Sequence, residues 1–111
     1  MTFSIRILPR AERDAQSIFK YLAQHSPEGA VRWWDAFEKA TRELGQDPFR
    51  YGLAAESGIF DYELRQFLFK TRRGRTYRGV FVVVGDEVRL LRVRGPGHSP
   101  LEADELPGTS S

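Results

Sequence analysis

The chain has 111 residues, of which 41% are hydrophobic and 29% charged, a composition typical of one globular domain. It contains no cysteine, which excludes disulfide scaffolds, thiol catalysis and cysteine-ligated zinc. With only two histidines, we expect no metal and no cofactor. No apolar run approaches the length of a membrane span and no secretory pattern opens the sequence, so we expect a cytoplasmic protein.

The net charge of +2 is unevenly distributed along the sequence. Residues 1–59 are neutral, residues 60–95 carry nine basic and four acidic side chains, and residues 96–111 carry three acidic ones. An excess of +5 therefore lies in one short segment. Such a segment attracts polyanions or an acidic protein partner. A charged strand face that protects a sheet edge from aggregation would give the same pattern.

The first half of the sequence predicts a strand followed by two helices. Residues 2–8 alternate in polarity, as a half-buried strand does. Pro9 suits a first helical turn, and apolar residues then recur at helical spacing. Ser26 can cap a second helix that has Pro27 at its first position and ends at Gly45. Two helices joined by so tight a turn form a helical hairpin.

The second half predicts an irregular stretch and then three strands. Residues 46–61 contain proline and glycine and have no regular period. A strand follows over Tyr62–Lys70. Thr76–Val84 and Glu87–Arg94 are expected to form a β-hairpin around Gly85-Asp86, a favourable turn dipeptide.

Together these elements give the order β-α-α-β-β-β. We expect a single α+β domain over residues 1–95, with the helical hairpin packed on one face of the sheet. Residues 96–111 are rich in proline and glycine and form a C-terminal tail, part of which we expect to be disordered.

Six short segments, taken in order, carry a resemblance to a known family. They are Pro9–Asp14, Ser26–Ala30, Leu53–Glu56, Glu63–Gln66, Tyr77–Phe81 and Val88–Arg94. This set resembles the RelE/ParE superfamily of bacterial toxins from type II toxin–antitoxin modules, and it is closer to the ParE-like branch. The likeness extends over roughly residues 3–106 and implies a twisted antiparallel sheet that carries the two helices.

The resemblance implies a different activity for each branch. ParE-like members inhibit DNA gyrase and are not enzymes, whereas RelE-like members cleave messenger RNA in the ribosomal A site. Members of both branches are neutralised by a cognate antitoxin. We therefore expect a toxin that inhibits DNA gyrase and binds an antitoxin. A metal-free RelE-like nuclease acting on ribosome-bound mRNA is the first alternative, and a non-toxic member that binds only antitoxin or nucleic acid is the second.

Metal-free RNA cleavage would need a base, an acid and cations around the phosphate. Under the RelE-like alternative the resemblance implies that Arg78 is the main phosphate-binding arginine, with Arg94 as a second functional arginine. His98 is the remaining candidate, but it lies between glycines and prolines in a loop unsuited to rigid positioning. Further candidates for binding nucleic acid or a protein partner are Arg65, Lys70, Arg72, Arg73, Arg75 and Arg92.

The register of the hairpin decides whether Arg78 and Arg94 meet. A three-residue loop places Arg78 opposite Arg94, whereas a two-residue loop places it opposite Val93. Two arginines directly across a strand pair repel each other, so the first register is tolerated best where an anion bridges them. Alternatively, both side chains extend into water.

Overall fold

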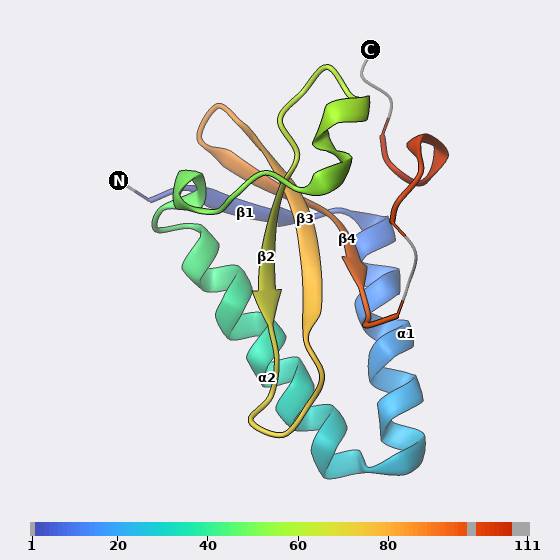
Figure 1. The fold of residues 1–111 in the computed structure, drawn as a ribbon. Helices are drawn as coiled ribbons and strands as arrows, with labels where there is room; N and C mark the ends of the chain where they lie inside the picture. Colours follow the sequence, from blue (N-terminus) through green and yellow to red (C-terminus); the bar gives the residue numbers. More distant parts are fainter. Residues whose placement is uncertain (1, 98–99, 108–111) are drawn as a thin grey trace.

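A computed structural model describes residues 2–97 and 100–107, and in these ranges it has the predicted order of elements (Figure 1). The regular elements are β1 (Ser4–Ile7), α1 (Pro9–His25), α2 (Pro27–Leu44), β2 (Arg65–Phe69), β3 (Tyr77–Val84) and β4 (Glu87–Arg94). Three short 3-10 helices are η1 (Pro48–Arg50), η2 (Ala55–Ile59) and η3 (Ala103–Glu105). Neither α-helix is long and apolar enough to cross a membrane.

The four strands form one sheet in the order β1-β4-β3-β2. β3 is antiparallel to both of its neighbours, β2 and β4, as expected, but β1 runs parallel to β4. The sheet is therefore mixed rather than wholly antiparallel. A parallel pair needs a long crossover, and here both helices and two strands lie between the two partners in the sequence.

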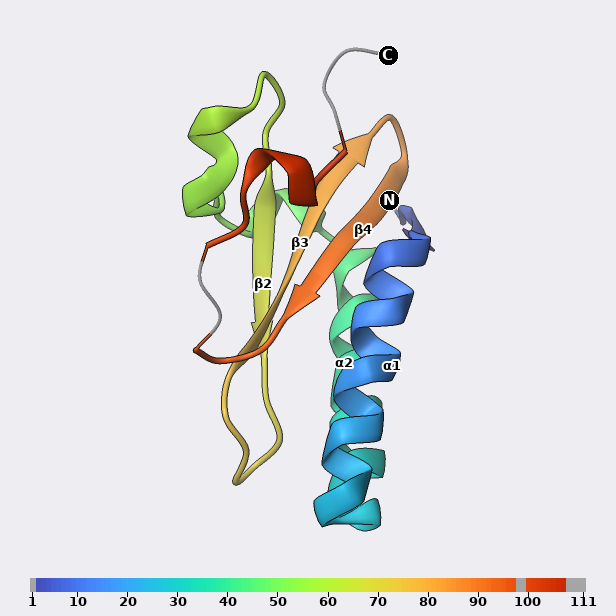
Figure 2. The same ribbon diagram turned by 90° about the vertical axis from the view of Figure 1, so that its right-hand side faces the viewer.

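Both helices begin at the predicted residues. Pro9 opens α1, and Ser26 both ends α1 and caps α2. The hydroxyl of Ser26 accepts a hydrogen bond from the backbone N–H of Gly29 at 3.0 Å, while its own N–H donates to Leu22 at 2.8 Å. Because one residue serves both helices, they pack as a hairpin against a single face of the sheet (Figure 2).

The core between the helices and the sheet is largely aromatic. Trp33 and Phe37 of α2 stack with ring centroids 5.5 Å apart, and both contact Phe69 of β2. Phe67 lies over Gly79 of β3, where an added Cβ would come within 2.4 Å of the ring. A glycine in β3 thus allows the phenylalanine of β2 to fill the core.

A second apolar cluster lies on the opposite face of the sheet. Its buried members are Ala54, Leu64, Val80, Leu91, Leu101 and Leu106. Leu101 and Leu106 belong to the C-terminal tail, so residues 100–107 pack on the sheet as a third layer across from the helices (Figure 2).

The strand predicted to begin at Tyr62 begins three residues later, at Arg65. The backbone of Leu64 is already bonded to the preceding loop. Its N–H donates to the hydroxyl of Ser57 at 3.0 Å, and its carbonyl accepts from Ala54 at 2.7 Å. Leu64 therefore belongs to the loop that precedes β2.

Candidate functional site

The hairpin places Arg78 directly opposite Arg94. Its loop has only the two residues Gly85-Asp86, and this loop alone would have placed Val93 opposite Arg78. Leu91 has no partner in β3 and forms a β-bulge, which shifts the register by one residue. Near the turn the pairing is that of a two-residue loop, and beyond the bulge it is the one expected for a three-residue loop, with Arg78 opposite Arg94.

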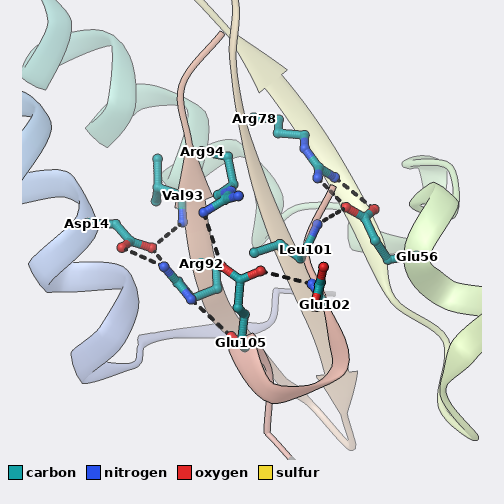
Figure 3. Close-up of polar contacts among 9 residues, drawn as sticks. All are labelled: Asp14, Glu56, Arg78, Arg92, Val93, Arg94, Leu101, Glu102 and Glu105. Carbon is teal, nitrogen blue, oxygen red and sulfur yellow. Dashed lines mark hydrogen bonds and ion pairs between the residues drawn. The ribbon is translucent and has the colours of Figure 1, made fainter. Parts of the chain in front are cut away.

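Arg78 is bound by Glu56, a residue of η2. Its Nη1 donates to Oε1 of Glu56 at 3.0 Å, and its Nη2 donates to Oε2 of the same carboxylate. Nη1 also donates to the side-chain oxygen of Gln66 at 3.1 Å. The backbone N–H of Leu101 donates to Glu56 Oε2 at 2.9 Å (Figure 3). One carboxylate thereby fastens η2 and the C-terminal segment to the sheet.

The environment of Glu56 keeps its carboxyl group ionised. The residue is only 6% exposed. Hydrogen bonding from Arg78 lowers its pKa to about 2, assisted by the N–H of Leu101 and opposed by burial. A carboxylate with so low a pKa is a weak base near neutral pH.

Arg92 is bound in the same way by Asp14 of α1. Its Nε and Nη2 donate to the two carboxylate oxygens at 2.7 and 3.1 Å. One of these oxygens also accepts the backbone N–H of Val93 at 3.0 Å. Arg92 Nη1 donates to the carbonyl of Glu105 at 3.0 Å, which ties the C-terminal segment to β4 as well. The hydrogen bonds to the Asp14 carboxylate raise the pKa of the Arg92 guanidinium above its already high ordinary value.

Arg94 is paired with the side chain of Glu105 at 3.4 Å. The other carboxylate oxygen of Glu105 accepts the N–H of Glu102 at 2.9 Å, and this bond lowers the pKa of Glu105. Arg78, Arg92 and Arg94, which we call the arginine cluster, are each paired with a carboxylate of the chain (Figure 3). Internal carboxylates thus take the place of the external anion that the Arg78–Arg94 pairing favours.

Arg65 does not join the arginine cluster. It pairs with Phe81 in the sheet and therefore shares the helix-covered face of β2 and β3. Its guanidinium donates to the carbonyl of Tyr51 at 2.6 Å and to Glu63 at 3.2 Å, and it lies 5.4 Å from the ring of Phe49. Arg65 is held locally at the start of β2.

The remaining basic candidates do not belong to the arginine cluster. His98 lies outside the described residues. Four others are exposed in the connection between β2 and β3: Lys70, Arg72, Arg73 and Arg75. No group of three or more acidic or histidine side chains that could hold a metal ion occurs in residues 2–97 and 100–107.

The sequence reasoning missed the three carboxylates that hold the arginine cluster. Glu56 had a weak signal, because it is a single acidic residue in an otherwise apolar stretch that begins at Leu53. Asp14 and Glu105 had none, because each lies among other charged residues. Their partners are 78 and 11 residues away in the sequence, beyond the reach of local spacing.

The chain thus has a helical hairpin on one face of a short mixed sheet and the Arg78–Arg94 pair on the other face. A sequence model of the family described as ParE toxin of type II toxin-antitoxin system, parDE, matches residues 5–96. The chain belongs to the ParE toxin family.

Solved structures share this fold, and one of them matches over most of both chains. It is described as the chromosomal ParDE TA system from P. aeruginosa, and it superposes with a TM-score of 0.63 at 21% sequence identity. The match covers 85% of this chain and 96% of that chain. No curated protein matches the chain.

Proposed function

We propose that this ParE-family toxin inhibits DNA gyrase by binding to it, and that a cognate antitoxin neutralises the toxin. The ParE-like character of the sequence supports gyrase as the target. Membership of a family of toxins from type II toxin–antitoxin systems supports neutralisation by a cognate antitoxin. We favour binding over RNA cleavage because Arg78 is already hydrogen-bonded to Glu56.

A nuclease of the RelE kind would need Arg78 to contact the scissile phosphate. Here a phosphate would have to displace a buried carboxylate that is bound by Arg78 and by Leu101. Leaving that carboxylate buried without its partner is costly. Glu56 is also unsuited to act as the general base, because its pKa is about 2.

Tyr77 is equally unsuited as an acid or base for a phosphate at Arg78. Successive strand residues point to opposite faces. Tyr77 packs on the helix-covered face, where its ring lies 5.5 Å from that of Trp33, and burial raises its pKa. The described residues around the arginine cluster therefore support a binding protein better than a nuclease.

The edge of the sheet offers a surface for the antitoxin. β2 is an edge strand whose first two residues pair with the loop at Gly52 and Leu53, and further along it the side chain of Leu68 is 61% exposed. An extended segment can add to such an edge through backbone hydrogen bonds, with an apolar side chain covering the exposed leucine. This geometry supports neutralisation by strand addition.

The experiment is a comparison of two targets with the purified toxin. We expect it to inhibit supercoiling of relaxed plasmid by DNA gyrase, and expect the antitoxin to restore supercoiling. Messenger RNA on translating ribosomes should remain intact in a parallel reaction. Cleavage of the mRNA with unaffected supercoiling would overturn the proposal in favour of a RelE-like nuclease. No effect in either reaction would overturn it in favour of a non-toxic member.

A further inference from the structure

A second basic surface lies at the tip of the helical hairpin, away from the arginine cluster. There the end of α1 and the start of α2 face the connection between β2 and β3, which extends beside the hairpin tip (Figures 1 and 2). Between them is an open groove of about 1150 Å³, and Gly95 and Pro96 after β4 complete its lining. We call it the hairpin-tip groove.

The charge of the hairpin-tip groove is entirely positive. Its lining includes no aspartate or glutamate. It includes four arginines, which are Arg32, Arg72, Arg73 and Arg75. All four are exposed, and none of them forms an ion pair with another described residue. In the arginine cluster, by contrast, every guanidinium is paired with an internal carboxylate. The hairpin-tip groove thus presents several cations together that can attract an external anion.

Aromatic side chains line the same groove. Tyr21 of α1 is 62% exposed, and its ring meets that of His25 edge-on at 5.0 Å. Behind them, Tyr77 packs against Trp33, whose ring nitrogen is buried without a hydrogen-bond partner among the described residues. The basic connection carries no aromatic residue of its own, so the fold brings rings from three other elements to face it.

We propose that the hairpin-tip groove binds single-stranded nucleic acid, with phosphates at the arginines and a base stacked on Tyr21. A groove that combines cations with exposed rings is the usual design for this ligand, because every base offers a flat face. Arginine suits phosphate, since its planar fork donates two parallel hydrogen bonds. An acidic peptide would satisfy the charge but would leave the exposed ring unused. The proposal does not depend on gyrase being the target.

The first test is the binding of a fluorescently labelled ten-nucleotide oligo(dT) to the full chain, measured by anisotropy. We expect affinity to fall about tenfold between 50 and 200 mM salt, because bound cations are released from the phosphates. We expect a further loss of about tenfold in the triple groove variant Arg72→Gln, Arg73→Gln, Arg75→Gln. The matched control removes the same charge from exposed positions away from the groove: Arg6→Gln, Arg13→Gln, Arg42→Gln.

The second test separates stacking from charge. Tyr21→Ala should weaken oligo(dT) binding about fivefold or more, whereas Tyr21→Phe keeps the ring and should bind as the wild type does. An equal loss in the groove and control triple variants would overturn the proposal, because net charge alone would then explain binding. An unaffected Tyr21→Ala variant would overturn the stacked geometry. Binding of a decaglutamate peptide without binding of oligo(dT) would make the groove an acidic-peptide site instead.

Discussion

Arg78 and Arg94 lie directly opposite each other on β3 and β4, and each is bound to a different carboxylate of the same chain. Two cations in that position repel each other unless anions compensate them. Glu56 compensates Arg78 from η2, and Glu105 compensates Arg94 from the C-terminal segment. The pairing therefore adds charged links to the contacts that join η2 and the C-terminal segment to the sheet.

Replacing Glu56 tests how much this junction contributes to stability. Glu56→Gln leaves Arg78 without a counter-charge in a largely buried position and weakens the bond to Leu101. We expect the free energy of unfolding to fall by about 3 kcal/mol in urea denaturation. Glu63→Gln is the matched control, because Glu63 is 69% exposed in its pair with Arg65, and it should change stability by less than about 1 kcal/mol. Equal effects of the two substitutions would show that the buried pair has no special role.

The Glu56 carboxylate also makes the free energy of unfolding depend on pH. The pKa of Glu56 falls from about 4.5 in the unfolded chain to about 2 in the fold, so the fold binds the proton less readily. This contribution is present in full above pH 4.5 and is lost as the pH falls towards 2. We expect the unfolding free energy of the wild type to drop more steeply between pH 5 and pH 2.5 than that of Glu56→Gln. If the two proteins lost stability equally between pH 5 and pH 2.5, the lowered pKa assigned to Glu56 would be wrong.

The C-terminal segment is expected to belong to the folded domain. Leu101 is 2% exposed, so Leu101→Ala removes apolar contacts and leaves a cavity in the second cluster. We expect a loss of about 2–3 kcal/mol in the free energy of unfolding. Leu68→Ala provides the control, since Leu68 is 61% exposed and its truncation should cost well under 1 kcal/mol. A Leu101→Ala variant as stable as the wild type would mean that the segment is detached in solution.

Gly79 is expected to tolerate no side chain. A Cβ there would lie 2.4 Å from the ring of Phe67 and 3.1 Å from Leu90, so Gly79→Ala forces the core to shift. We expect destabilisation of about 1–3 kcal/mol by thermal or urea unfolding. Gly52→Ala is the control, because a Cβ at that position meets nothing within 4 Å. Equal stability of the Gly79→Ala and Gly52→Ala variants would contradict the close contact between Gly79 and Phe67.

The helices and the hairpin could be predicted because their signals are local. Pro9 and the Ser26-Pro27 pair specify where the helices start through caps and a fixed φ, and Gly85-Asp86 specifies the turn. The parallel partner of β1 could not be predicted, because strand pairing depends on contacts far apart in the sequence.

The arrangement of the arginine cluster had only a weak signal in the sequence. The alternation of apolar and charged residues along Val88–Arg94 shifts at Leu90-Leu91, where the bulge lies, but the carboxylate partners are distant in the sequence. The packing of the C-terminal segment had a faint signal, since Leu101 and Leu106 are isolated apolar residues in a polar tail. Prolines and glycines nearby favoured disorder more strongly.

Arg78 is expected to stabilise the fold and to lie outside the surface with which the toxin binds its target. The most direct measurement is gyrase supercoiling inhibition by the double variant Glu56→Gln, Arg78→Gln, which removes both charges of the pair at once. With the variant shown to be folded by circular dichroism, we expect an inhibitory concentration within about threefold of the wild-type value. A loss of inhibition of about a hundredfold or more in the folded variant would contradict the claim, because it would make Arg78 part of the active surface.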